Sequence, residues 1–374
     1  MKRFNAGSFI NQGYYKSFEP NVINRPWNVD DMQVLSLLSR ADRHLGRLDM
    51  YSEYVNIDLF LSMHIAKEAT QSSKIEGTQT NMEEAFLNKE DVSYEKRDDW
   101  EEVQNYIQAM NEAVKLLSSL PFSSRLITKA HTILLQGVRG KSKLPGEYRR
   151  SQNWIGGATL NDAVFIPPNH NSIQTLISDL EKFANDELNP LPDLLKIAII
   201  HYQFETIHPF LDGNGRVGRL LITLYLVSKG VLKKPMLYLS DFFEKNRTLY
   251  YDNLMRVRTH NDLTQWLKFF LSGIIETAKS GVKTFDGILQ LQRMNEEKIK
   301  ELKARSSDAK LVLDHLYVKP IVDVKAVSKI ISKSLVSSYR LISDMEKLEI
   351  LDEITGAERD RVYAYSSYLD LFSS

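Results

Sequence analysis

The sequence predicts a mainly α-helical protein with one β-hairpin near its middle and a winged helix-turn-helix at its C-terminal end. Three observations support this prediction. Apolar residues recur at helical spacing over most of the chain from residue 31 onward. Glycine, proline and asparagine gather in a central stretch, residues 144–169. After residue 306, three helical patterns precede two β-rich runs, which is the composition of a winged helix-turn-helix.

The composition is that of an ordinary soluble globular protein of 374 residues, which is long enough for two or three domains. Its 48 basic residues balance 48 acidic ones, so the overall charge does not favour bulk attraction to nucleic acid or membranes. The chain has no cysteine, which excludes disulfides, thiolate catalysis and thiolate metal sites. The start lacks an apolar segment of signal-peptide length, and no apolar run can span a bilayer. We therefore expect a cytoplasmic protein without membrane contact.

The helical patterns of the first half follow a polar segment. Residues 1 to about 30 are polar and aromatic with two prolines, so we expect an extended arm. Helices are then predicted over residues 31–48, 53–76, 98–117 and 124–135. Gly77 directly follows the second of these helices and suits the left-handed position at a helix C-terminus.

The second half begins with the hairpin. Residues 154–166 are expected to form it, because NWIG and AVFIP flank a GATLND turn. Further helices are predicted over residues 173–185, 191–207, 216–229 and 263–279, and a charged connecting helix is expected to end near residue 306. The C-terminal helices are predicted over residues 308–317, 324–331 and 334–348, before two β-rich runs around a TGAERD turn.

These patterns divide the chain into four parts. We expect N-terminal helices in residues 1–85, a helical core in residues 86–283 and a connecting helix in residues 284–305. The winged helix-turn-helix is expected in residues 306–374.

One twelve-residue stretch, HPFLDGNGRVGR at residues 208–219, carries more polar chemistry than a simple turn needs. The proline after His208 disfavours helical backbone at the histidine, so the preceding helix is expected to end just before it. A new helix is predicted to start near Arg216, with free backbone N–H groups and the positive end of its dipole facing the loop. Gly213 and Gly215 allow the backbone to wrap closely around an anion.

The charged residues of this stretch suit a bound di- or triphosphate. Arg216 and Arg219 lie three residues apart and share a face of the first helical turn, where guanidinium groups can hold phosphate oxygens. Asp212 suits Mg²⁺, which usually takes one or two carboxylates plus phosphate oxygens. His208 can act as general base for an attacking hydroxyl. The alternative, a capped helix with surface arginines and a structural histidine, leaves this ordered clustering unexplained.

At these residues the sequence resembles the Fic family, whose motif HPFx(D/E)GNGRxxR it matches at every specified position. The helical organisation that resembles the family covers about residues 30–280. The resemblance implies a Fic-type helical core with a β-hairpin flap. It also implies transfer of AMP from ATP to a Ser, Thr or Tyr hydroxyl of a target protein, with Mg²⁺ as cofactor. Candidate partners are ATP, a target protein (the chain itself included) and a second copy in a homodimer.

The resemblance also implies a role for each matching position. His208 would deprotonate the target hydroxyl, and Asp212 would hold Mg²⁺ between the α- and β-phosphates. Arg216 would bind the β-phosphate and Arg219 the γ-phosphate, while Phe210 would anchor the loop. The other residues that we assign to nucleotide binding here are Gly213, Asn214 and Gly215, which would line the anion hole, and Gly218.

A second stretch, SSKIEGTQT, contains Ser72-x-x-x-Glu76-Gly77, which is similar to the Fic inhibitory motif (S/T)xxxE(G/N). A solvated helix end is the alternative for so short a pattern, but the complete long motif favours inhibition. Glu76 is expected to pair with Arg219, so that ATP binds with misplaced phosphates; a misplacement near 1 Å can cost about a hundredfold in rate. In some members this glutamate also helps to remove AMP from the target, and the sequence leaves that alternative open.

The hairpin at residues 154–166 resembles the family's flap, which holds a target segment by main-chain pairing. Its tip consists of Thr159, Leu160, Asn161 and Asp162, and the alternative is a plain surface hairpin. A later helical stretch resembles the segment that borders the adenine in the family. It makes Tyr251 our first candidate for contact with the base and Asn246 our second, although aromatic residues in helices usually belong to the core.

The usual function of a winged helix-turn-helix is DNA binding, here with residues 334–348 as recognition helix. Residues 306–374 contain nine Lys and Arg against eleven Asp and Glu, whereas a DNA reader normally presents a basic face. Docking to a protein, or dimer packing, accounts for this module at least as well.

Two classes of function follow from these observations. The first is an enzyme, a protein adenylyltransferase inhibited in cis by Glu76. The second is a transcriptional regulator whose winged helix binds DNA and whose core senses nucleotide. The complete motif favours the enzyme, because a sensor does not need the base His208. A third alternative keeps the enzyme but transfers UMP or phosphocholine, although the motif shows none of the departures expected of those branches.

Overall fold

The computed structural model describes residues 4–54, 57–137, 141–356 and 360–373, and it confirms the mainly α-helical fold. The helices are α1 (Met32–Asp49), α2 (Tyr51–Tyr54), α3 (Asp58–Ile75), α4 (Arg97–Leu116), α5 (Ser124–Leu134), α6 (Ile173–Asn185), α7 (Asp193–Ile207), α8 (Asn214–Ser228), α9 (Ser240–Lys245), α10 (Arg247–His260), α11 (Leu263–Lys300), α12 (Ser306–Val318), α13 (Val324–Ile331), α14 (Leu335–Lys347) and α15 (Ser366–Ser373). The strands are β1 (Gly7–Asn11), β2 (Lys16–Pro20), β3 (Ile321–Asp323), β4 (Asp352–Glu353) and β5 (Val362–Ala364). No helix within the described ranges combines the length and the apolarity needed to cross a membrane.

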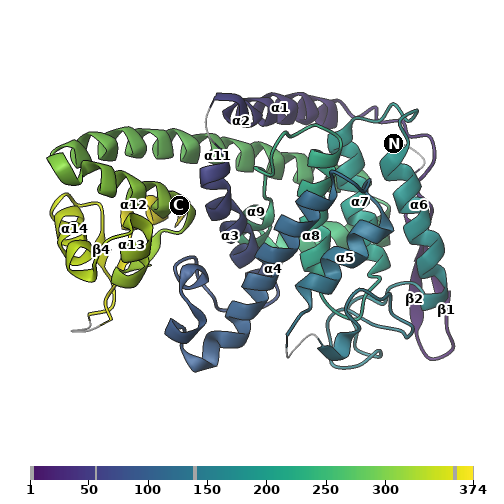
Figure 1. Cartoon of the computed structure of the whole chain (residues 1–374). Coiled ribbons are helices and arrows are strands. Elements are labelled where there is room, and N and C mark those ends of the chain that lie inside the picture. Colours follow the sequence, from purple (N-terminus) through teal and green to yellow (C-terminus); the bar gives the residue numbers. More distant parts are fainter. Residues whose placement is uncertain (1–3, 55–56, 138–140, 357–359, 374) are drawn as a thin grey trace.

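The centre of the molecule is the helix pair α7 and α8, which are joined by the loop that contains the polar turn (Figure 1). Nearly every residue of α7 is buried, which explains why its sequence is apolar all round rather than on one face. α6 and α11 pack against α7, whereas α4 and α5 pack against α8. The surrounding helices therefore fix the two helix ends between which the loop is held.

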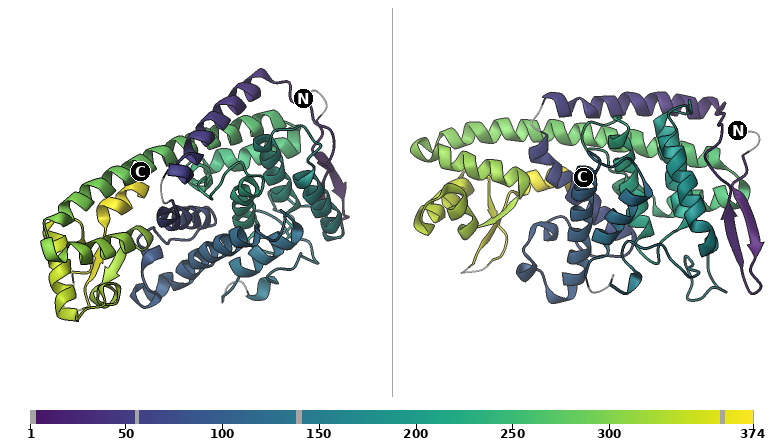
Figure 2. Two further views of the ribbon diagram at one scale, coloured as in Figure 1. Left: turned by 45° about the horizontal axis from the view of Figure 1, so that its top comes forward. Right: turned by 45° about the vertical axis from the view of Figure 1, so that its right-hand side comes forward.

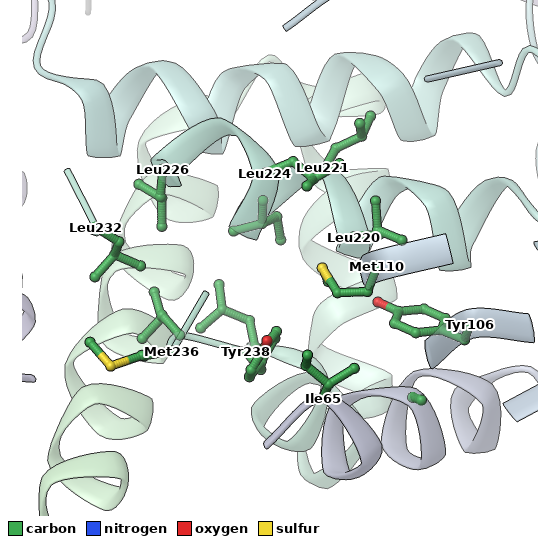
Figure 3. Packing of buried hydrophobic residues seen from close by; sticks show 14 of the residues in the cluster. Ile65, Tyr106, Met110, Leu220, Leu221, Leu224, Leu226, Leu232, Met236 and Tyr238 are labelled. Carbon is green, nitrogen blue, oxygen red and sulfur yellow. The ribbon is translucent and has the colours of Figure 1, made fainter. Parts of the chain in front are cut away.

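An apolar layer joins α3 to α8 and α4, as Figure 3 shows. Ile65 of α3 and Tyr106 of α4 lie in this layer with Leu220 and Leu224 of α8, and each is at most 4% exposed. Full burial of such a side chain contributes roughly 1.5–3 kcal/mol. The layer consequently holds α3, which leads to Glu76, in a fixed place relative to the start of α8.

The predicted helix at residues 53–76 is divided in the structure. Its first residues belong to the short α2, residues 55–56 lie outside the described residues, and α3 begins at Asp58. Gly77 follows the end of α3 with a φ of 108°, the left-handed conformation that the sequence predicts there.

α11 is a single helix where we predicted two, a helix at residues 263–279 and a separate connecting helix. The glycines inside it do not end it, because they serve close packing instead. A Cβ on Gly281 would lie 2.9 Å from Leu48 of α1, and one on Gly287 would lie 2.9 Å from Leu371. α1 runs along the first part of α11, and the far end of α11 leads to the C-terminal module, as the views in Figure 2 show.

The C-terminal module, defined as residues 306–374, contains the three helices and the two β-rich runs that the sequence predicts. We did not predict β3 or α15. β3 completes an antiparallel sheet in the order β3-β5-β4, with Ile321 opposite Ala364. The middle of the TGAERD turn, residues 357–359, lies outside the described residues.

The C-terminal module packs directly on the first half of α3. The ring of Phe60 lies edge-on to Tyr317 at 5.3 Å, and Ser62 Oγ donates a hydrogen bond of 2.9 Å to the carbonyl oxygen of Val318. The imidazole of His64 meets the ring of Phe372 at 5.0 Å. One end of α3 therefore contacts the module, and the other end leads to Glu76.

The N-terminal arm contains a β-hairpin that we did not predict. β1 and β2 pair in antiparallel fashion, and Gly13 in the turn has a φ of 93°. Phe18 of β2 is buried against Phe165, with ring centroids 6.1 Å apart. This tertiary contact stabilises the strands, and a local sequence pattern cannot reveal it.

The hairpin predicted at residues 154–166 is reduced to a single bridge between Ile155 and Phe165. The backbone N–H groups of Ala158 and Thr159 instead donate to the carboxylate of Asp162, at 2.8 and 2.6 Å. These local bonds replace a regular ladder, so the segment is a hairpin-shaped loop.

Candidate functional site

The turn between α7 and α8 contains two residues with left-handed backbone. α7 ends at Ile207 as predicted, and His208 has φ 49° and ψ 61°. Gly213, with a φ of 73°, immediately precedes α8. Asn214 closes the loop, because it accepts a 2.8 Å hydrogen bond from the N–H of Phe210 and donates one of 2.9 Å to its carbonyl oxygen. A left-handed residue with a Cβ costs roughly 1–2 kcal/mol, so surrounding contacts must hold the histidine.

His131 of α5 packs against this loop and stabilises it. Its imidazole stacks on Phe210, with centroids 3.6 Å apart and planes 8° from parallel. The N–H of Gly146 donates to His131 Nδ1 at 2.8 Å, so Nε2 carries the proton and donates to the Asp212 carbonyl oxygen at 3.1 Å. Burial lowers the pKa of His131 to about 4, which keeps this neutral form at neutral pH. We did not predict this role, because α5 and the loop meet only in the folded chain.

Glu76, just past the end of α3, reaches Arg219 as the sequence predicts. Arg219 Nη2 donates to Glu76 Oε1 at 2.7 Å and to the Ser72 carbonyl oxygen at 2.9 Å, while its Nε donates to Ser72 Oγ at 2.8 Å. The Arg219 side chain is 1% exposed and that of Glu76 is 38% exposed. A Cβ on Gly215 would lie 2.3 Å from Glu76 Oε1, so the carboxylate rests directly on the first turn of α8.

Arg216 has a different acidic partner. Its Nη1 donates to Glu102 Oε2 of α4 at 2.9 Å, and its Nη2 lies 3.9 Å from Asp212 Oδ1. The side chain is 6% exposed. In this arrangement Arg216 is not among the described residues that line the adjacent cavity.

The cavity has a volume of about 460 Å³ and lies between the turn, α10 and the hairpin segment. The turn supplies His208, Leu211, Asp212, Gly213, Asn214, Gly215 and Arg219 to its lining. The facing side consists of Trp154, Ile155, Gly156, Val164, Phe165, Tyr250, Tyr251, Leu254 and Met255. Three further charged residues complete it, namely Glu76, Glu205 and Arg258.

The two candidate base contacts have different positions. Tyr251 lines the cavity and is 38% exposed. Asn246 is not among the described lining residues, and its side chain donates to the carbonyl oxygen of Phe242 at 3.0 Å instead. Asn246 separates α9 from α10, so the single helical stretch that we expected there is broken at this residue. Contact of Asn246 with the base stays a prediction, and it would require this side chain to leave the Phe242 carbonyl oxygen.

Gly218 also lies apart from the cavity, although we assigned it to nucleotide binding. A Cβ at this position would lie 2.2 Å from Glu205 Oε1, and the Gly218 carbonyl oxygen lies 2.9 Å from His201 Nδ1. Gly218 therefore admits the buried Glu205 side chain between α7 and α8. Its role in this structure is close packing.

Burial and charge set the protonation states around the cavity. Burial, helped by the positive charges of Arg258 and Arg149, lowers the pKa of His208 to about 4, so its imidazole is neutral at neutral pH. Burial raises the pKa of Glu205 to about 7. Although burial alone would raise the pKa of Glu76, the pairing with Arg219 holds it below its ordinary value.

The predicted flap tip, Thr159–Asp162, lies beyond the cavity. Thr159, Asn161 and Asp162 are exposed, Leu160 is half-buried, and none of these four described residues lines the cavity. The residues that line the cavity from this segment come from its two ends instead, namely Trp154–Gly156 and Val164–Phe165.

Asp212 stands at the rim of the cavity with its side chain 47% exposed. Its Oδ1 accepts a 2.6 Å hydrogen bond from the N–H of Gly213. No group of three or more His, Cys, Asp or Glu side chains that could hold a metal occurs within the described ranges. A single carboxylate fits Mg²⁺ that is bound mainly through phosphate oxygens, and it does not fit a metal held by protein ligands alone.

Comparison with known proteins places this site in a family. Family models match residues 35–115 (Fic/DOC family N-terminal) and residues 121–226 (Fic/DOC family). Over 125 residues, the chain is 30% identical to "Protein adenylyltransferase Fic" of Drosophila erecta and 34% identical to the protein of that name from Culex quinquefasciatus. Each match covers 33% of this chain and 22% of the relative, so the chain spans about a fifth of the length of these relatives.

Solved structures agree at the level of the fold. A Fic family protein from Desulfovibrio desulfuricans G20 aligns with a TM-score of 0.58 at 18% identity, over 91% of this chain and 98% of that one. A Fic domain containing signaling protein from Bacteroides thetaiotaomicron VPI-5482 aligns with a TM-score of 0.51 at 18% identity, over 67% and 96%. With the two family models covering both the region of Glu76 and the polar turn, the chain belongs to the Fic/DOC family.

Proposed function

We propose that this chain transfers AMP from ATP to a Ser, Thr or Tyr hydroxyl of a target protein, and that Glu76 holds it in an inhibited state. One observation carries the proposal. A neutral histidine, a glycine-lined helix N-terminus with a buried arginine, and a carboxylate that covers this N-terminus all meet in one cavity. The names of the relatives support the reaction class.

In the proposed reaction, the target hydroxyl oxygen attacks the α-phosphorus of ATP while His208 takes its proton. A bond forms between that oxygen and the α-phosphorus, and the bond from the α-phosphorus to the bridging oxygen breaks. Pyrophosphate leaves, and AMP remains on the target. The N–H groups at the start of α8 and the guanidinium of Arg219 stabilise negative charge, so the chain contributes mainly position and electrostatics.

Asp212 would hold the Mg²⁺ that accompanies ATP, which supplies positive charge beside the leaving pyrophosphate. Arg216 would contribute to the β-phosphate only after a change of partner, because its guanidinium is bound to Glu102. We therefore expect nucleotide binding to move Arg216 toward the cavity.

Inhibition follows from the place of the Glu76 carboxylate. It occupies the first turn of α8 and engages Arg219, which are the two features that would bind the terminal phosphates. A phosphate brought to the same place meets a negative charge and loses its arginine partner. Displacement of Glu76 would restore both features.

The reaction class can be tested with the Glu76→Gly variant, Mg²⁺ and ATP labelled with ³²P at either the α- or the γ-phosphate. The acceptors are the chain itself and a cell extract. Protein labelled from the α-position but not the γ-position is the expected result. Label from the γ-position would show phosphoryl transfer and contradict the proposal. Label from UTP or CDP-choline in place of ATP would identify a different transferred group.

The regulator alternative makes the opposite prediction. It requires DNA binding that responds to ATP, and no label on protein from any nucleotide. The nine basic and eleven acidic residues of the C-terminal module do not favour it.

A further inference from the structure

Arg149 is a fully buried arginine held by main-chain carbonyl oxygens. It is 2% exposed, and within the described ranges its guanidinium has no carboxylate partner. Its Nε donates to the carbonyl oxygen of His208 at 2.9 Å, and its Nη1 donates to that of Ser151 at 3.0 Å. Its Nη2 donates to the carbonyl oxygens of Pro168 and Ile207, at 2.6 and 3.3 Å.

These four acceptors belong to two segments that are distant in the sequence. Ser151 and Pro168 stand just before and just after the hairpin segment of residues 154–166. Ile207 and His208 form the start of the polar turn. One guanidinium therefore joins both stems of the hairpin segment to the backbone of the histidine.

The main chain and a neighbour reinforce the same junction. The N–H of Arg149 donates to the carbonyl oxygen of Pro209 at 2.9 Å. Asn153 Nδ2 donates to the carbonyl oxygens of His208 and Phe210, at 3.3 and 3.0 Å. The carbonyl groups of the turn thus accept hydrogen bonds from Arg149 and Asn153, which precede the hairpin segment in the chain.

The physical chemistry of Arg149 points to a role beyond packing. Burial lowers its pKa to about 10, so the guanidinium stays charged at neutral pH despite its loss of hydration. A buried charge with no opposite charge beside it is costly, and an apolar side chain of similar shape avoids that cost. The left-handed conformation of His208 also costs energy and persists only where its surroundings enforce it. Arg149 supplies that enforcement through the carbonyl oxygen of His208 itself.

We propose that Arg149 is a positioning residue that sets the place of the His208 imidazole relative to the hairpin segment, and hence relative to a target chain bound there. The inference rests on the proposed function and on the role that the resemblance implies for that segment, which is to hold the target. Because a shift near 1 Å between reacting groups can cost about a hundredfold in rate, this junction controls transfer without contacting ATP.

The test uses Arg149→Met and Arg149→Lys, each in the full chain with Glu76→Gly so that transfer is measurable. Methionine keeps the bulk but removes every donor, and lysine keeps the charge but cannot span four acceptors. The matched control is Arg150→Met, because Arg150 is the neighbouring residue, its side chain is 81% exposed and it pairs with Glu147. The measurements are kcat, KM for ATP, and the melting temperature of each variant.

We expect both Arg149 variants to lose about a hundredfold in kcat, with KM for ATP within about threefold of the parent, and Arg150→Met to resemble the parent. A folded Arg149→Met protein with kcat within threefold of the parent would overturn the proposal. So would Arg149→Lys with full kcat, because charge alone would then suffice. If Arg149→Met does not fold, Arg149→Lys and Asn153→Ala decide the question by the same criterion.

A second measurement does not depend on activity and separates this inference from the proposed function. Hydrogen exchange is followed in residues 154–166 and residues 207–213 with the wild-type Glu76 in place. Loss of Arg149 should accelerate exchange in both segments together, and Arg150→Met should change neither. If the parent does not transfer AMP, the proposed function fails while this result still decides whether Arg149 joins the segments. Faster exchange in only one segment would contradict the junction.

Discussion

Replacement of Glu76 by glutamine should raise the rate of AMP transfer by about 5- to 30-fold. The substitution keeps the size of the side chain and removes its charge, so it isolates the ion pair with Arg219. A hydrogen bond to a charged group contributes about 1.5–3 kcal/mol. The Glu76 side chain is 38% exposed, and solvent screening reduces that contribution to about 1–2 kcal/mol. About 1.4 kcal/mol corresponds to a factor of ten in an equilibrium constant. Weakening the ion pair between Glu76 and Arg219 should therefore raise the population of the state in which Glu76 is displaced by about 5- to 30-fold.

Glu76→Gly should raise the rate further than Glu76→Gln. Glycine also removes the atoms that rest on the first turn of α8, where a Cβ on Gly215 would lie 2.3 Å from the carboxylate. The difference between the two variants therefore measures how much of the inhibition is steric.

The assay is the initial rate of ³²P incorporation from α-labelled ATP at several ATP concentrations. Glu83→Gln is the control, because Glu83 is an exposed glutamate in the same part of the chain. We expect the control to stay within twofold of the wild type. A Glu76→Gln rate equal to that of the wild type would refute the view that the ion pair inhibits transfer. A lower rate would show that Glu76 assists the reaction.

Three further predictions concern the base, the buried histidines and the C-terminal module. His208→Ala in the Glu76→Gly background should abolish transfer and leave ATP affinity within about threefold by calorimetry; retained transfer would refute the base assignment. Four buried histidines bind fewer protons in the folded chain than in the unfolded chain between about pH 4 and 6.5, so their contribution to the free energy of unfolding should rise with pH there, by up to about 1.4 kcal/mol per unit for each histidine. Glu205, whose pKa is raised to about 7, contributes a slope of the opposite sign and offsets part of this rise. The four histidines are His64, His131, His201 and His208, whose pKa values burial lowers to about 3, 4, 3 and 4; urea denaturation at several pH values measures the slope, and a flat profile would contradict their burial as neutral groups. Removal of residues 306–374 should leave basal transfer in the core. The removal uncovers Phe60 and His64 at the start of α3, whose other end leads to the inhibitory Glu76, so it should not lower the rate of transfer. Complete loss of transfer from a core that circular dichroism shows to be folded would mean that the C-terminal module is needed to hold the catalytic site together.

The sequence was enough to predict the turn between α7 and α8, because the residues with chemical roles and the residues that determine the backbone conformation lie in one short segment. The proline after His208 ends α7 at Ile207, and the two glycines beside Asn214 begin α8 at a turn with free N–H groups. The pairing of Glu76 with Arg219 could also be predicted, although the two residues are far apart, because the resemblance to a known motif supplied the long-range contact.

The sequence did not suffice where a partner comes from a distant element. Glu102 of α4 holds Arg216, and nothing in the polar turn indicates this acidic partner. The same limit explains the missed roles of His131 and Arg149, whose contacts with the turn exist only in the folded chain. The sequence also did not indicate the break between α9 and α10 at Asn246, where the side chain donates to the Phe242 carbonyl oxygen.

Local patterns also misled us about regular structure. We predicted that a helix ends at residue 279, but α11 continues through Gly281 and Gly287, which pack closely against α1 and α15, and the local sequence does not show these neighbours. β1 and β2 depend on the burial of Phe18 against Phe165. In both cases tertiary packing decides between conformations that local sequence leaves nearly equal.

The most direct test of the central claim compares three full-length proteins with Mg²⁺ and ATP labelled with ³²P at the α-phosphate: the wild type, Glu76→Gly, and Glu76→Gly with His208→Ala. We predict weak label on protein from the wild type, strong label from Glu76→Gly, and none from the double variant. Equal label from the wild type and Glu76→Gly would contradict inhibition by Glu76, and strong label from the double variant would contradict catalysis by His208.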